Sequence, residues 1–351
     1  MLSDPVVPPP ATHSVPIPPA LSERYQRNSA GRAWLDGLPF QLADRLDEWQ
    51  LTVDLAPGRL PWSGHGGLVV PVRQQDGSPA ALKIAFPHDE ARVEQHALAL
   101  WGGLGAVGLL ASDAASCAML LERLDGDWSL LDVPMDDAVR VWGGLVRQLG
   151  LAPDGRPEWR EFGHIAARAE QWSDDLPADW EQLGRPFPRW LLEAALEVCQ
   201  TRGAVGRRSA RDLLVHTDLH YLNILARLGT ASADEAATPA GYAAIDPQPL
   251  IGEPEFAVAP LLWNRLADLP ASGAGSALLE RCHDFSAAAG LDPEVARQWG
   301  VAREVENALA YAAQGHQGDL ARSLWVASTL AGRTLDGLPH PHSLPEPGQG
   351  G

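Results

Sequence analysis

The stretch LLVHTDLHYLNIL, residues 213–225, decides the fold of this chain. An apolar run at 213–215 leads into a polar loop, and a second apolar run leaves it after Asn223. Short apolar runs on both sides of a polar segment predict two buried strands joined by a loop. Loops held by a rigid scaffold are where binding and catalytic side chains concentrate. The polar residues of this loop are therefore the first candidates for chemistry.

Asp218 and Asn223 stand five residues apart in the loop. A carboxylate can accept the proton of an attacking hydroxyl, and an amide oxygen can bind a Mg²⁺ ion that also binds phosphate. This D-x-x-x-x-N spacing is typical of the catalytic loop of kinases. We predict that Asp218 is the catalytic base and Asn223 a Mg²⁺ ligand. For the flanking His216 and His220 we expect structural hydrogen bonds rather than a zinc site.

A second acidic residue follows about twenty residues later. The run 243–245 (Ala-Ala-Ile) predicts a strand that Asp246 leaves and Pro247 stops. An Asp in this place, after the catalytic loop, holds the second metal ion in kinases. Asp246 is therefore the second predicted Mg²⁺ ligand, and an Asp that only caps a turn is the alternative.

Lys83 is the only lysine among 27 basic residues, the rest being arginine. It lies in the predicted strand 80–85, which forms a hairpin with the run 68–72, and Glu94 lies on a helix predicted over 88–101. A Lys on such a strand, paired with a Glu on such a helix, holds the α- and β-phosphates of ATP in kinases. The ammonium of Lys is compact, whereas the guanidinium of Arg is a broad planar group, so Arg is a poor replacement for Lys at such a phosphate site. Chance survival of one lysine is the alternative.

A glycine-rich turn, WSGHGG at 62–67, precedes this hairpin. Small residues allow backbone N–H groups to approach phosphates closely. We predict nucleotide binding by Ser63, Gly64 and Gly66. The spacing differs from G-x-G-x-x-G, and a plain hairpin turn is the alternative.

The character of the chain changes once along its length. Segments between Leu51 and Leu121 are short and β-like around one helix, whereas from Asp127 onward the pattern is mainly helical. This order predicts an α+β fold with a small β-rich N-terminal lobe and a larger helical lobe. We place the lobes at 23–122 and 123–335. A disordered Pro-rich tail is expected at 1–22 and a flexible tail at 336–351.

Composition excludes several classes of protein. The formal net charge of −18 argues against binding to nucleic acid, which requires Lys and Arg, and it suits a cationic partner or simply a solvated acidic surface. There is no apolar run of about 20 residues for a membrane helix, and the N-terminus lacks the pattern of a signal peptide. We therefore expect a cytoplasmic protein.

Four longer stretches show a resemblance to a known family. LLVHTDLHYLNILA and AIDPQPLIGEPEFAVAPLLWNR closely resemble the aminoglycoside/hydroxyurea phosphotransferase family, which includes streptomycin kinases. EQHALALWGGLGAVGLL and LLERLDGDWSLL are similar to its αC and hinge regions. The resemblance extends over roughly residues 25–335 and is most specific in the first two stretches.

The resemblance implies a two-lobed, protein-kinase-like fold with ATP and Mg²⁺ between the lobes. It assigns the catalytic, metal-binding and phosphate-binding roles to the residues already singled out, and it assigns recognition of the adenine edge to the linker from Glu122 to Leu124. Thr217 departs from a Gly that is common in the wider group, and Tyr221-Leu222 from a frequent Pro-Gly. These departures bear on specificity rather than on activity.

The expected acceptor is a small hydroxyl-bearing molecule, a cationic aminoglycoside such as streptomycin. We predict that Asp268, Glu304 and Glu306 contribute to its pocket, with a solvated helix face as the alternative for the two glutamates. There are two kinds of alternative. The acceptor is another small alcohol or a hydroxyurea-like molecule, or the chain is a non-catalytic nucleotide-binding protein of the same fold.

Overall fold

The computed structural model describes residues 15–64, 66–203, 211–230 and 238–344. The chain forms two compact units, one reaching to Arg92 and including Leu109–Arg123, the other containing Val93–Gly108 and the chain from Leu124 onward. The sequence places this division at 122/123, so most of the helix that carries Glu94 lies in a different unit than expected. The reason is visible at Trp101, whose Nε1 donates to the carbonyl oxygen of Leu149 at 2.8 Å in the second unit.

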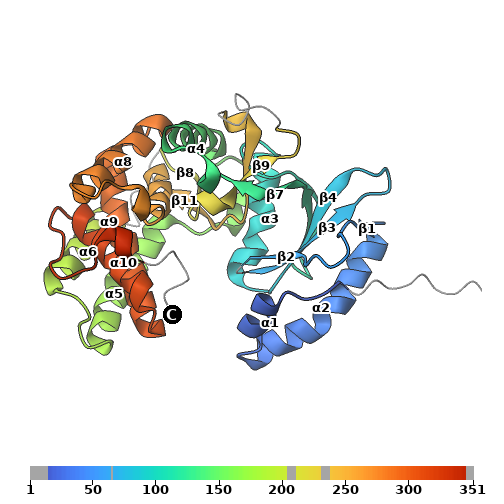
Figure 1. Ribbon diagram of the computed structural model, residues 1–351, viewed down its shortest axis with the longest axis horizontal. Helices are drawn as coiled ribbons and strands as arrows, with labels where there is room; N and C mark the ends of the chain where they lie inside the picture. Colours follow the sequence, from blue (N-terminus) through green and yellow to red (C-terminus); the bar gives the residue numbers. More distant parts are fainter. Residues whose placement is uncertain (1–14, 65, 204–210, 231–237, 345–351) are drawn as a thin grey trace, which may run out of the picture. The chain divides into compact units, whose positions relative to one another are not determined.

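The first unit is built on a six-stranded antiparallel sheet (Figure 1). Its strands run in the order β1-β3-β4-β6-β5, with β2 paired to β3. The bounds are β1 Thr52–Val53, β2 Trp62–Ser63, β3 Gly67–Arg73, β4 Pro79–Ala85, β5 Leu109–Asp113 and β6 Ala118–Glu122. The predicted hairpin is confirmed as the pairing of β3 with β4.

Two helices, α1 (Pro19–Tyr25) and α2 (Ser29–Glu48), pack on the sheet of this unit. The sequence does not predict α2, although Asn28 caps it by accepting from the backbone N–H of Gly31 at 2.7 Å. Leu21, at a position assigned to a disordered tail, is fully buried in the same core. The ordered chain therefore begins before residue 23.

The core under these helices sets the direction of Lys83. On β4 the alternating residues Ala80, Leu82 and Ile84 belong to the hydrophobic core that α2 covers. Successive side chains of a strand point to opposite faces, so Lys83 points away from α2. Its side chain is only 6 % exposed, between Val69 and Met119 on the neighbouring strands.

The second unit is mainly helical, as predicted (Figure 1). Its helices are α3 Asp89–Trp101 (from Val93 onward), α4 Met135–Leu149, α5 Ile165–Gln182, α6 Arg189–Arg202, α7 Ala259–Leu262, α8 Ala274–Ala289, α9 Pro293–Gln314 and α10 Gln317–Leu330. The break between α9 and α10 lies where the glycines predict it, and Gly315 ends α9 with φ +77°. No helix within the described ranges combines the length and apolar character needed to cross a membrane.

Five short strands cross this helical unit and form two small sheets. They are β7 Leu124–Ser129, β8 Leu213–His216, β9 Ile224–Arg227, β10 Tyr242–Ala244 and β11 Pro249–Gly252. One sheet has the order β10-β9-β7, and the other pairs β11 with β8. The strands predicted around Ile224 and Ala243 are thus confirmed; β9 follows the loop that carries Asp218, and β10 precedes Asp246.

Close packing of α4 on α8 gives a prediction for stability. A Cβ atom added at Gly143 would lie 2.6 Å from the backbone carbonyl of Ala288, whereas one added at Gly37 on α2 would meet nothing closer than 3.9 Å. We expect Gly143→Ala to destabilise the protein by about 1–3 kcal/mol through overpacking. Gly37→Ala should be neutral or stabilising by up to about 1 kcal/mol, because Ala restricts the unfolded chain more than Gly. Urea unfolding of the two variants would contradict this packing if both lost the same free energy.

Candidate active site

Two short ladders hold the loop 217–223 opposite the segment 245–248. In one ladder His216 of β8 pairs with Pro249 of β11, and in the other Ile224 of β9 pairs with Ala244 of β10. The two segments between the ladders are therefore fixed at both ends. The structure in this way brings Asp218 and Asn223 to the segment that carries Asp246.

Hydrogen bonds tie the two segments together between the ladders. The backbone N–H of Ile245 donates to the carbonyl of Asn223 at 2.9 Å. The hydroxyl of Thr217 donates to the carbonyl of Gln248 at 2.6 Å, and Thr217 is fully buried. Thr217, which the sequence connects with specificity, therefore has a clear structural role in closing this part of the site.

His216 holds the loop in place through hydrogen bonds of a neutral imidazole. Its Nε2 lies 2.9 Å from the carbonyl oxygen of Ile245, and its Nδ1 lies 3.3 Å from the backbone nitrogen of Asp218. These partners require a proton on Nε2 and a lone pair on Nδ1. Burial lowers the pKa of His216 to about 4, which keeps this tautomer uncharged near neutrality. The predicted structural role of His216 is confirmed.

The amide of Asn223 is oriented by Asp218. Its Nδ2 donates to the backbone carbonyl of Asp218 at 2.9 Å and lies 3.4 Å from the carboxylate Oδ2. Because the nitrogen faces Asp218, the amide oxygen faces the other way. Asp246 adopts the left-handed conformation with φ +52°, which Asp tolerates better than most residues.

The donor set of Asn223 and Asp246 fits Mg²⁺. One carboxylate and one amide oxygen are hard ligands, and Mg²⁺ completes its octahedron with phosphate oxygens and water. Within the described part of the chain, no group of three or more His, Cys, Asp and Glu side chains is arranged to hold a metal ion alone.

Arg303 of α9 also reaches this loop, and the sequence gives no sign of it. Its guanidinium donates to the backbone carbonyl of Thr217 and lies 3.3 Å from Oδ1 of Asp218. The guanidinium carbon lies 5.5 Å from the centre of the Phe256 ring. A helix residue 85 positions away in the chain has no local spacing that would reveal this contact.

Glu304, next on α9, is a buried carboxyl only 1 % exposed. Its Oε1 accepts from Asn307 at 3.2 Å, and its Oε2 has no hydrogen-bond partner among the described residues. Burial raises the pKa of Glu304 to about 7, which Ser323 and Arg303 offset only in part. Burial also raises the pKa of Tyr311, with contributions from the charges of Glu304 and Asp218. The charge of Asp218 thus reaches Tyr311, and the charge of Arg303 reaches Glu304.

The other two predicted acceptor residues differ in their surroundings. Burial raises the pKa of Glu306, and the charges of Arg303 and of Arg168 on α5 offset this only in part. Asp268 is exposed and pairs with Arg265 at 2.6 Å. A role for either residue in binding an acceptor remains a prediction.

The glycine-rich turn of the first unit is anchored to protein groups. The carbonyl of Gly64 accepts from Arg24 at 2.9 Å, and that of Gly66 accepts from the backbone N–H of Phe86 at 2.8 Å. Ser63 ends β2 and is exposed, and His65 lies outside the described residues. The need for glycine is greatest at Gly67, where a Cβ atom would lie 2.4 Å from the carbonyl oxygen of Ile84.

Three further residues predicted to bind nucleotide lie where the chain passes between the units. Glu94 is buried on α3 and belongs to the second unit, whereas Lys83 belongs to the first, so their pairing stays a prediction. Glu122 ends β6 opposite Ala80, and Leu124 begins β7. The segment 122–124 thus connects the two units, as expected of a linker, and its contact with adenine stays a prediction.

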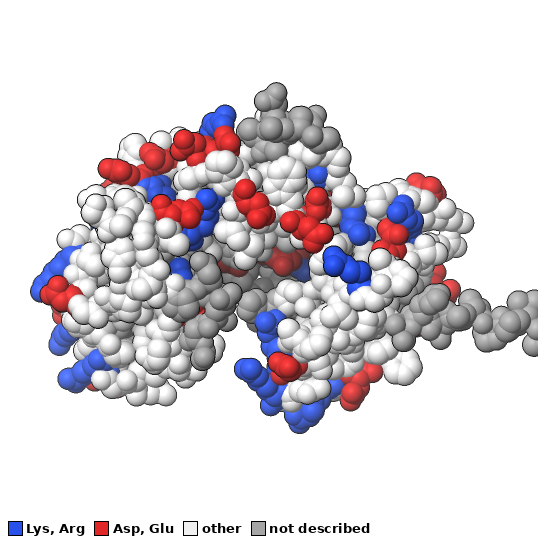
Figure 2. Space-filling view, viewed as in Figure 1, with Lys and Arg blue, Asp and Glu red and all other residues white. Residues whose placement is uncertain are grey.

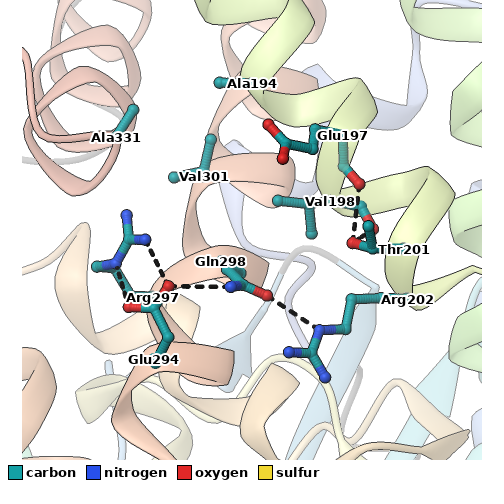
Figure 3. Close-up of a pocket in the computed structure, with 10 residues that line it drawn as sticks. All are labelled: Ala194, Glu197, Val198, Thr201, Arg202, Glu294, Arg297, Gln298, Val301 and Ala331. Atoms are coloured by element: carbon teal, nitrogen blue, oxygen red, sulfur yellow. Dashed lines mark hydrogen bonds and ion pairs between the residues drawn. The ribbon is translucent and has the colours of Figure 1, made fainter.

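A cavity of about 550 Å³ lies elsewhere in the second unit, between α6 and α9 (Figure 3). Several of its polar groups bond to each other: Arg297 pairs with Glu294, and Arg202 donates to the amide oxygen of Gln298. None of its lining residues belongs to the loop 217–223 or to the segment 245–248. Its size alone therefore does not make it the active site.

Comparison with known proteins agrees with this geometry. The family model described as aminoglycoside/hydroxyurea antibiotic resistance kinase matches residues 49–315. A streptomycin 6-kinase of Streptomyces griseus is 35 % identical over 90 % of this chain and 97 % of that protein. A hydroxyurea phosphotransferase of Kitasatospora aureofaciens is 33 % identical over 91 % of this chain and 87 % of that protein.

Solved structures confirm the predicted protein-kinase-like, α+β fold. A thermostable mutant of aminoglycoside phosphotransferase APH(4)-Ia, in ternary complex with ADP and hygromycin B, aligns with a TM-score of 0.54 at 13 % identity, over 83 % of this chain and 96 % of that chain. Ethanolamine kinase of Plasmodium vivax also gives 0.54, at 11 % identity, over 82 % and 83 %. At such identities the likeness establishes the fold alone.

The buried Glu304 predicts an unusual dependence of stability on pH. Between about pH 4.5 and 7 the folded protein keeps a proton that the unfolded chain has released, so stability falls as pH rises through this window. We expect Glu304→Gln to remove this loss. Its gain over the parent in unfolding free energy should be larger at pH 8 than at pH 4 by roughly 3 kcal/mol.

Chemical denaturation at the two pH values measures this difference. Glu280→Gln, which removes one exposed carboxylate of α8, is the control for general charge effects. An equal change for Glu304→Gln at both pH values would contradict a protonated Glu304.

Proposed function

The chain belongs to the aminoglycoside/hydroxyurea antibiotic resistance kinase family, and from this premise we propose that it transfers the γ-phosphate of ATP to a hydroxyl of a streptomycin-like aminoglycoside. The proposal rests on one observation: two ladders hold the loop with Asp218 and Asn223 opposite the segment that carries Asp246. The streptomycin 6-kinase of Streptomyces griseus, similar along nearly its whole length, supports the choice of acceptor. ATP is an intracellular cosubstrate, so we place the reaction in the cytoplasm.

Asp218 is the proposed catalytic base. Its carboxylate orients the acceptor hydroxyl toward the γ-phosphorus and takes its proton as the new O–P bond forms. The backbone of Asp218 is held by His216, and its side chain is flanked by Asn223 and Arg303. Such positioning and charge stabilisation supply most of the acceleration in phosphoryl transfer.

Asn223 and Asp246 would hold the Mg²⁺ ions, and Lys83 would bind the α- and β-phosphates. The ions held there would help to neutralise the charge that develops on the transferred group. Lys83 suits its role because it is a buried ammonium on the sheet face away from α2, with Ala81 and Ala85 as small neighbours on the same face. Small side chains leave room beside the ammonium for a phosphate chain.

The overall charge gives little support for a cationic acceptor. On the face shown in Figure 2, acidic and basic side chains are interspersed rather than gathered in one patch. The net charge of −18 is therefore a weak guide to the binding site. Glu304 is a stronger one, since a cation bound beside it would favour the ionised carboxylate and complete its hydrogen bonding.

A second candidate acceptor is hydroxyurea, favoured by the similarity to the hydroxyurea phosphotransferase of Kitasatospora aureofaciens. Hydroxyurea is small and uncharged, so it would gain nothing from an ionised Glu304. The two acceptors thus make different demands on the same part of α9.

Parallel incubations with streptomycin and hydroxyurea test the function. We expect mass spectrometry to show one added phosphate on streptomycin, dependent on ATP and Mg²⁺, with a higher kcat/KM than for hydroxyurea. Glu304→Gln should raise the KM for streptomycin and leave the KM for ATP unchanged. If only hydroxyurea is turned over efficiently, the acceptor is hydroxyurea and the proposed phosphotransfer stands. If no hydroxyl acceptor is phosphorylated, the proposal is wrong.

The role of Asp218 gives a direct prediction. Asp218→Asn keeps the shape of the side chain and removes the base, so turnover should fall by about 10²–10⁴-fold while nucleotide affinity survives. Asp212→Asn is the matched control, because Asp212 is a buried Asp that pairs with His164 at 3.1 Å away from the loop. Calorimetry with ATP and steady-state kinetics measure the two properties, and turnover within tenfold of the parent for Asp218→Asn would rule out its role as base.

A further inference from the structure

We propose that Arg303 is a positioning residue for the reaction, which fixes the carboxylate of Asp218 in the orientation needed to receive the acceptor proton. This inference rests on the proposed function, because it assumes that Asp218 is the base. It adds a residue from the late helix α9, far from the catalytic loop in sequence.

The contact geometry is that of a clamp on two consecutive residues. One terminal nitrogen of Arg303 donates to the backbone carbonyl of Thr217, and the other lies 3.3 Å from Oδ1 of Asp218. A guanidinium can serve both acceptors at once because its donors are arranged in a rigid fork. Arg303 therefore holds the Asp218 side chain at a fixed position relative to the backbone of Thr217.

Both carboxylate oxygens of Asp218 are engaged from different sides. Oδ1 faces Arg303, whereas Oδ2 lies 3.4 Å from Nδ2 of Asn223 and 3.8 Å from Nε2 of His220. Partners on both oxygens oppose rotation about the bond that carries the carboxylate. Without Arg303, the contacts would restrain Oδ2 but not Oδ1.

Arg303 is itself held in place by aromatic packing. Its guanidinium lies over Phe256, which is fully buried and packs against Trp299 with ring centres 5.2 Å apart. The Arg303 side chain is only 14 % exposed. A cation over an aromatic face in a partly buried position is restrained in both distance and direction.

The charge of Arg303 makes a purely stabilising role a poor explanation. A positive charge beside the base opposes the approach of a cationic acceptor. A benefit to the orientation of Asp218 accounts for a cation at this place, since a misplacement of about 1 Å can cost about 10²-fold in rate.

The test compares Arg303→Met with Arg297→Met in the full-length protein. Arg297 is a matched control on the same helix, since it also joins one backbone carbonyl, that of Leu330, and one carboxylate, that of Glu294. For Arg303→Met we expect kcat to fall by about 10²-fold with a KM for ATP within about threefold of the parent. Arg297→Met should change thermal stability and leave kcat within about twofold.

Two further measurements separate positioning from general damage. Millimolar guanidinium chloride should restore part of the kcat of Arg303→Met, and sodium chloride at equal ionic strength should not. Arg303→Lys, which keeps the charge and the stem over Phe256, should have an intermediate kcat, because an ammonium lacks the rigid fork that spans both acceptors. If Arg303→Met does not fold, guanidinium activation of Arg303→Lys is the readout.

The outcomes distinguish this inference from the function on which it rests. If Asp218→Asn is inactive and Arg303→Met behaves like Arg297→Met, Arg303 has no positioning role and the proposed base stands. Loss of kcat that guanidinium does not restore in either Arg303 variant would likewise overturn the inference. If Asp218→Asn is as active as the parent, the assignment of the base itself fails.

Discussion

The site depends on two short ladders that fix the catalytic loop at both of its ends. The segments 217–223 and 245–248 lie between the ladder of β8 with β11 and the ladder of β9 with β10. Hydrogen bonds from Thr217 and Ile245 close the space between them. A polar loop crossing the inside of a unit must satisfy its own backbone groups, and here it does so in the way that aligns its functional side chains.

Burial shifts the pKa values of two polar side chains, His216 and Glu304, towards the uncharged form. His216 stays uncharged because burial lowers its pKa, and this leaves it able both to donate to Ile245 and to accept from Asp218. Glu304 is different, since burial raises its pKa and one of its oxygens has no hydrogen-bond partner in the described structure. A buried carboxyl with a raised pKa is a candidate for a functional role, and Glu304 lies on the helix that also carries Arg303.

The loop 217–223 and its flanking strands could be predicted from the sequence because the information for them is local. Asp218 and Asn223 are five residues apart, and apolar runs on either side identify the strands that hold them. The isolated lysine in a β-pattern identified the strand of Lys83 in the same way. In both cases, short-range spacing reports the local structure directly.

Other features escaped prediction because they depend on tertiary contacts. Arg303 reaches Asp218 only because α9 packs beside the loop, and Thr217 was connected with specificity although its hydroxyl serves the backbone of Gln248. The similar residues Glu304 and Glu306, two positions apart on one helix, face different surroundings. Helix α2 was missed although Trp34, Leu38 and Leu42 have helical spacing, and Pro39 within it obscures the pattern.

The stereochemical course at phosphorus distinguishes direct transfer from a two-step reaction. In the proposed reaction the acceptor hydroxyl, oriented by Asp218, attacks the γ-phosphorus of ATP in line, and ADP leaves in the same single displacement. ATP made chiral at the γ-phosphorus should therefore give a phosphorylated acceptor with inverted configuration. Retention would require two displacements through a phosphorylated side chain of the enzyme, and it would contradict direct transfer at this loop.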